Sequence, residues 1–95
     1  MKKKVLIVDD DVNFRYAIRE LIPWKDYGFE VVNEAIHGKQ ALDFLEQQMV
    51  QVVMTDMEMP IMDGVELTKC IKMRYPDIIV VAMSAYDDFS FVKES

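Results

Sequence analysis

The sequence reads VLIVDDD at residues 5–11 and VVMTD at residues 52–56, so two short apolar runs each end in acidic residues. Continuous apolar runs of this length are typical of strands buried within a parallel sheet. In open α/β sheets, ligands bind in the crevice outside the carboxyl ends of the strands. If the two runs form neighbouring strands, Asp9, Asp10 and Asp56 meet at one edge of the sheet.

Three clustered carboxylates repel one another unless a cation or a proton lies between them. Two unit charges ~4 Å apart cost about 4 kcal/mol at an effective dielectric constant of ~20. Magnesium prefers one or two carboxylates, with water and phosphate oxygens completing its shell. The pattern therefore predicts a Mg²⁺ site with Asp10 and Asp56 as direct ligands, Asp9 bound through water, and a backbone carbonyl from the next loop. The alternative is a set of solvated acids.

Asp56 is expected at the end of a strand, just before a loop, where its side chain can project into a crevice. A carboxylate can attack phosphorus and form an acyl phosphate. Because phosphoryl transfer depends on positioning and on cancelling charge at the phosphoryl oxygens, a nearby metal ion favours this role. Ser84 follows the last apolar run, and its hydroxyl could bind a phosphoryl oxygen and pull a loop inward. It could instead cap the next turn.

The composition predicts one small domain over residues 1–95, since 52% of the residues are hydrophobic. The longest apolar stretch, residues 78–83, is too short to span a bilayer, and the run after the N-terminal lysines ends in acids, unlike a signal peptide. The single Cys70 fits a reducing cytosol, so we expect a cytoplasmic protein without a membrane partner. The net charge of −6 argues against nucleic-acid binding by this segment.

Strand and helix patterns alternate along the chain, which predicts an α/β fold with a parallel sheet, right-handed crossovers and helices on both faces. Pro60 and Gly64 are expected to shape the loop after Asp56, because proline fixes φ and glycine permits a positive φ. Asp63 is expected to be a turn acid. Strands are expected at residues 4–8, 29–35, 52–55 and 78–83, and helical faces over residues 14–22 (capped by Asp11 or Asn13), 38–49, 65–74 and from Asp88 or Ser90.

The stretches VLIVDDD, VVMTDMEMPIMDG (residues 52–64) and IIVVAMSA (residues 78–85) resemble a response-regulator receiver domain of bacterial two-component signalling. The resemblance covers essentially the whole chain and implies a flavodoxin-like (CheY-like) doubly wound sheet with strand order 2-1-3-4-5. It implies that a histidine kinase phosphorylates the residue at Asp56 and that Ser84 senses the phosphoryl group.

The resemblance also implies that Asp9 and Asp10 hold Mg²⁺, with the backbone carbonyl of Glu58 completing the shell. The Glu58 side chain could point to solvent or the pocket rim, or into the pocket. The segments at residues 24–29 and 84–89 resemble a subset of receivers fused to AraC-type DNA-binding output domains. This subset implies transcriptional control in a longer protein, with DNA bound only through an output domain that these residues do not include.

Receivers also have a fifth helix and a fifth strand that ends in a functional lysine, and this sequence stops before both. Lys93 cannot take that role. We therefore expect a C-terminally incomplete receiver domain, a truncated piece of a longer protein, with weak or absent phosphorylation. The strand at residues 78–83 would then have an unpaired apolar edge, which predicts a homodimer through that edge.

The leading prediction is a signalling domain rather than an enzyme, with at most self-catalysed phosphorylation and dephosphorylation. Two alternatives stay open. The chain could be a pseudo-receiver that is folded but not phosphorylated and acts as a protein-interaction module. It could also be a phosphatase of the haloacid-dehalogenase type. The segment Asp9-Asp10-Asp11 loosely resembles the paired-aspartate motif of those enzymes. However, Asn13 stands where that motif has Thr or Val, and 95 residues are too few for the remaining loops.

Overall fold

The structure is a computed structural model that describes residues 2–57 and 62–83. Strands and helices alternate along these residues, as the sequence pattern predicts. The strands are β1 (Lys3–Val8), β2 (Phe29–Ala35), β3 (Val52–Asp56) and β4 (Ile79–Met83); the helices are α1 (Val12–Leu21), the short 3₁₀ helix η1 (Trp24–Tyr27), α2 (Gly38–Leu45) and α3 (Gly64–Arg74).

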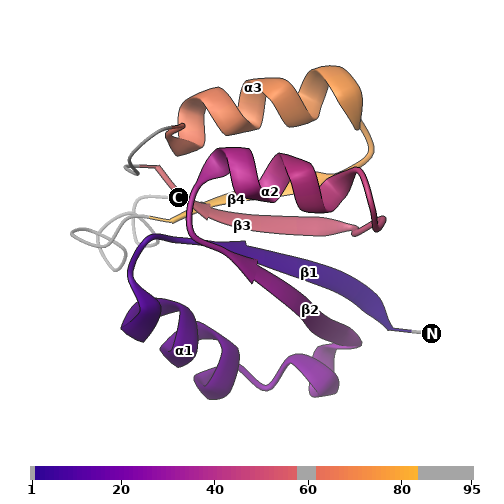
Figure 1. Cartoon of the computed structure of the whole chain (residues 1–95). Coiled ribbons are helices and arrows are strands. Elements are labelled where there is room, and N and C mark those ends of the chain that lie inside the picture. The colour runs from indigo at the N-terminus through magenta and orange to yellow at the C-terminus, as the bar shows by residue number, and fades with distance from the viewer. Residues whose placement is uncertain (1, 58–61, 84–95) are drawn as a thin grey trace, which may run out of the picture.

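The strands form one parallel sheet in the order β2-β1-β3-β4. This order confirms the flavodoxin-like arrangement predicted for the first four strands. The register places Val8 of β1 between Ala35 of β2 and Thr55 of β3, and Asp56 beside Met83 of β4. The carboxyl ends of the four strands therefore lie along the same edge of the sheet (Figure 1).

Helices cover both faces of the sheet, α2 and α3 on one side and α1 on the other (Figure 1). The β1 residues point alternately to the two faces, and both faces are buried, so the run VLIV contains no polar residue. Buried residues on the α1 side are Val5, Ile7 and Val52. Those on the α2 and α3 side are Leu6, Val8, Ala35, Ala41, Leu42, Leu45, Val50, Val53, Leu67, Ile71 and Ile78.

Polar side chains start each α-helix. Asp11 caps α1, His37 caps α2 and Asp63 caps α3, each by accepting a backbone N–H from the first turn. The open choice of cap for α1 is thus resolved for Asp11 rather than Asn13. Pro23 follows the end of α1, as expected from its fixed φ and missing N–H.

One expectation about element position is wrong. Helix α2 ends at Leu45, and Met49 is exposed, because the chain turns after Phe44 with the N–H groups of residues 47 and 48 bonded to its carbonyl. Within the described part of the sheet, β4 is at the edge, as expected from the sequence. The predicted fourth helix lies outside the described residues. No helix in residues 2–57 or 62–83 is long and apolar enough to cross a membrane.

Candidate functional site

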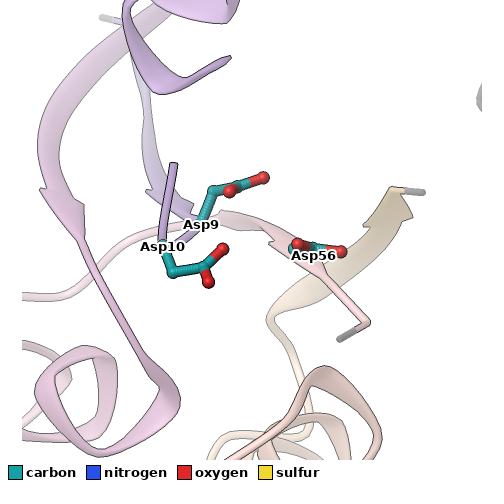
Figure 2. Close-up of side chains that lie close together, drawn as sticks. All are labelled: Asp9, Asp10 and Asp56. Carbon is teal, nitrogen blue, oxygen red and sulfur yellow. The ribbon is translucent and has the colours of Figure 1, made fainter. Parts of the chain in front are cut away.

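Three carboxylates meet at the carboxyl edge of the sheet. Asp9 and Asp10 follow β1, Asp56 ends β3, and one carboxylate oxygen of each lies within 4.8 Å of the others. Figure 2 shows the three side chains close together at the ends of these two strands. Since β1 and β3 are direct neighbours in register, the juxtaposition follows from the fold, as the sequence pattern predicts.

Three of the four polar groups of Asp9 make hydrogen bonds. Its N–H donates to the carbonyl oxygen of Ala35 at 3.0 Å, and its Oδ1 accepts the N–H of Asp11 at 2.8 Å. Its carbonyl oxygen accepts a bond from Nη1 of Arg15 at 2.6 Å. The fourth polar atom, Oδ2, is buried and has no hydrogen-bond partner among the residues that the structure describes. A buried carboxylate oxygen without a donor is poorly satisfied by the protein alone.

The pKa of Asp9 is raised from 3.8 to about 6, and burial is the largest cause of this rise. The hydrogen bond from the Asp11 backbone lowers the pKa, and the negative charges of Asp56 and Asp10 contribute to the rise. The side chains of this cluster offer only oxygen atoms, the ligand type that Mg²⁺ prefers. A bound cation would satisfy Asp9 Oδ2 and reduce the repulsion within the cluster, so the residues present fit a divalent metal ion.

Gly64, the first residue of α3, lies against the backbone of Asp56 and Met57. A Cβ atom here would overlap the carbonyl oxygen of Asp56 and approach Cα of Met57 to 2.7 Å. The N–H of Gly64 also donates to the Met57 carbonyl at 3.1 Å. Gly64 therefore permits a close approach of backbones rather than a positive φ, which corrects the sequence expectation. Among the described glycines, a positive φ occurs at Gly28, where η1 ends.

A basic residue that was not predicted from the sequence lies beside the site. Arg15, on α1, contacts the Asp9 carbonyl and pairs through Nε with Oε1 of Glu34 on β2 at 3.0 Å. Glu34 also accepts from Nη1 of Arg19 at 2.8 Å. The spacing of Arg15 and Arg19 places them on one helix face and was a usable signal. Nothing in the sequence alone indicated that Glu34 lies opposite.

Two predicted site residues, Glu58 and Ser84, lie outside the described residues, so their roles stay predictions. The described neighbours of these residues are close together, because the N–H of Met57 donates to the carbonyl of Met83 at 3.3 Å. Asp10 is exposed, whereas Asp9 and Asp56 are buried. The cluster is thus reached by solvent mainly through Asp10.

The family model of the response regulator receiver domain matches residues 5–95. The chain belongs to this family. An uncharacterized response regulatory protein of Staphylococcus epidermidis (strain ATCC 12228) is 39% identical over 90 residues, which cover 95% of this chain and 35% of that protein. The transcriptional regulatory protein HptR of Staphylococcus aureus (strain NCTC 8325) is 38% identical with the same coverage. The receiver chain therefore spans 35% of the length of these two relatives.

Solved structures lead to the same family. The REC domain of AraT, a response regulator from Geobacillus stearothermophilus, is 40% identical with a TM-score of 0.85, and the match covers 99% of this chain and 73% of that one. A two-component transcriptional regulator AraC from Clostridium phytofermentans is 35% identical with a TM-score of 0.82, over 97% and 74% of the two chains. Receiver domains are signalling domains that interact with histidine kinases and bind Mg²⁺ at an acidic pocket.

Proposed function

We propose that this receiver domain takes a phosphoryl group from a sensor histidine kinase onto Asp56 with the help of Mg²⁺. The observation that carries the proposal is the meeting of Asp56 with Asp9 and Asp10 at the strand ends. Asp56 ends β3 at the edge of the sheet where ligands bind in this type of fold. A carboxylate at this position can attack phosphorus, and the acids around it can hold the metal ion that the transfer requires.

In this proposal Asp10 and Asp56 bind Mg²⁺ directly, Asp9 binds it through water, and the backbone carbonyl of Glu58 completes the protein ligands. The buried and unbonded Oδ2 of Asp9 supports this assignment. The ion supplies positive charge that offsets the charge on the phosphoryl oxygens. Ser84 is proposed as the hydroxyl that senses the phosphoryl group, which the pairing of Met57 with Met83 supports.

For the whole protein, we propose a cytoplasmic response regulator that controls transcription through a DNA-binding output domain outside these residues. The similarity to HptR and to the AraC regulator of Clostridium phytofermentans supports a transcriptional role. In this view the domain is a switch rather than an enzyme, and self-catalysed phosphorylation and dephosphorylation are its only chemistry.

We also propose that the domain forms a homodimer through the outer edge of β4. Within the described residues β4 pairs only with β3. Ile79 and Val81 of this strand are 60% and 39% exposed, so apolar side chains flank backbone groups that a second strand could pair with.

A phosphatase that acts through Asp9 is disfavoured. A nucleophile must reach its substrate, but Asp9 is only 2% exposed and its Oδ1 is bonded to the Asp11 N–H. Asp56 is also buried, at 7% exposed, so we propose it as the acceptor for its place at the end of β3 and not for its exposure. The pseudo-receiver alternative differs from the proposal in that the domain would gain no phosphoryl group.

A Mg²⁺ titration by calorimetry tests the metal half of the proposal. We expect saturable binding to the wild-type protein and a loss of about tenfold or more in affinity for Asp10→Asn, because the variant removes a charged ligand. Asp43→Asn is the matched control, since Asp43 is an exposed acid on α2 outside the cluster. Equal affinity of the two variants, or no binding by the wild type, would contradict the proposal.

A further inference from the structure

We propose that Arg15 is a positioning residue for the acidic site, since it holds the backbone of Asp9 in the place where Mg²⁺ requires it. The inference rests on the proposed function and extends it to a residue outside the carboxylate cluster. Arg15 does not act as a ligand; its Nη1 donates to the Asp9 carbonyl oxygen at 2.6 Å. It is therefore a link between α1 and the segment that carries both Asp9 and Asp10.

This hydrogen bond matters because the three carboxylates of the cluster repel one another. The charges of Asp10 and Asp56 act on Asp9, which is buried and has an unbonded Oδ2. Without a tie, the end of β1 could relieve this repulsion by moving away from β3. The hydrogen bond from Arg15 to the Asp9 carbonyl and the bond from the Asp9 N–H to Ala35 together hold both backbone polar groups of Asp9 in place.

Arg15 is itself held. Its Nε donates to Oε1 of Glu34 at 3.0 Å, and the two side chains are only 11% and 21% exposed, unlike an ordinary surface ion pair. Glu34 lies on β2, so Arg15 connects α1, the end of β1 and β2 through one side chain. A guanidinium can do this because its donors form a rigid fork, whereas the single ammonium group of lysine lacks that geometry.

Arg19 provides a matched control. It lies on the same helix and pairs with the other oxygen of Glu34 at 2.8 Å, but it is more exposed, and no contact with Asp9 is among its bonds. If the effect of Arg15 came only from the ion pair with Glu34, the two arginines would behave alike. If it comes from the Asp9 carbonyl, only Arg15 matters to the site.

The experiment compares the wild type with Arg15→Met, Arg15→Lys and Arg19→Met. Two quantities are measured for each folded protein: the Kd for Mg²⁺ by calorimetry and the hydrogen-exchange rate of the Asp11 amide by NMR, since this amide bonds to Asp9 Oδ1. We expect Arg15→Met to weaken Mg²⁺ binding about tenfold and to speed exchange at Asp11. Arg15→Lys should recover part of both effects, and Arg19→Met should leave both at wild-type values.

The inference is overturned if Arg15→Met binds Mg²⁺ as tightly as the wild type, even if its stability falls, because a purely structural residue would lower stability alone. It is also overturned if Arg19→Met shows the same loss. Should Arg15→Met fail to fold, Arg15→Lys carries the comparison. If the wild type binds no Mg²⁺, the proposed function fails, and the exchange rate at Asp11 still decides whether Arg15 positions Asp9.

Discussion

Asp9 is a buried acid whose charge the protein only partly compensates. Backbone and side-chain donors satisfy its carbonyl and Oδ1, while Oδ2 has no described hydrogen-bond partner and two acids lie nearby. Such a residue lowers the stability of the metal-free fold. A site that must bind a cation retains this cost, because a fully neutralised carboxylate would be a weaker ligand.

Replacing Asp9 by Asn should therefore stabilise the metal-free protein at neutral pH. The folded-state pKa of about 6 lies above the reference value of 3.8, so the folded protein binds the proton more tightly than the unfolded chain. The contribution of Asp9 to stability is thus most favourable at low pH and falls as the pH rises through about 6. At pH ~7 the cost is on the order of 3 kcal/mol. Asn keeps an oxygen for the Asp11 N–H.

Urea unfolding without Mg²⁺ measures this effect. We expect a gain of about 1–3 kcal/mol in the free energy of unfolding for Asp9→Asn at pH ~7, and little gain at pH ~3.5, where the wild-type carboxyl is protonated in the folded state. Asp43→Asn serves as the exposed control. A gain of the same size at both pH values would show that the charge of Asp9 is not its cause.

At the scale of the elements, the helices bury very different amounts of apolar surface. Leu67 and Ile71 of α3 are fully buried, whereas α1 has no buried residue and its Leu21 is 80% exposed. The 3.6-residue period predicts which residues share a face of α1, but it cannot show how much of that face another element covers. Coverage depends on neighbours that are distant in the sequence.

Alanine substitutions at Leu67 and Leu21 should differ in their effect on the free energy of unfolding. Leu67→Ala should lower the free energy of unfolding by about 2–5 kcal/mol, because it leaves a cavity in the core under α2 and α3. Leu21→Ala should change it by less than about 0.5 kcal/mol, as expected for an exposed position. Denaturant titrations of the two variants test this. A loss at Leu21 as large as that at Leu67 would show that α1 packs much more tightly in solution.

The sequence predicted the parts of the site that depend on strand order. Apolar runs locate β1 and β3, and the acids that follow them must meet once the strands are neighbours. It could not predict the contact of Arg15 with Asp9 or the close approach of Gly64 to Asp56. Both depend on how a helix packs against a strand end, and no local pattern encodes that distance.

For the whole molecule, the edge of β4 predicts self-association. Light scattering should show an average mass that rises with protein concentration. Val81→Lys should shift the protein toward monomer, because a charged side chain on an edge strand blocks strand pairing. Val65→Lys is the control, since Val65 is also an exposed valine but lies on α3. A folded monomer at high wild-type concentration would contradict the dimer.

Phosphorylation of Asp56 is tested by an intact-mass measurement after incubation with acetyl phosphate, with and without Mg²⁺. We expect a labile gain of one phosphoryl group that requires Mg²⁺, maps to Asp56 and is absent in Asp56→Asn. A gain that persists in Asp56→Asn, or a gain without Mg²⁺, would contradict the assignment of Asp56 as a Mg²⁺-dependent phosphoryl acceptor.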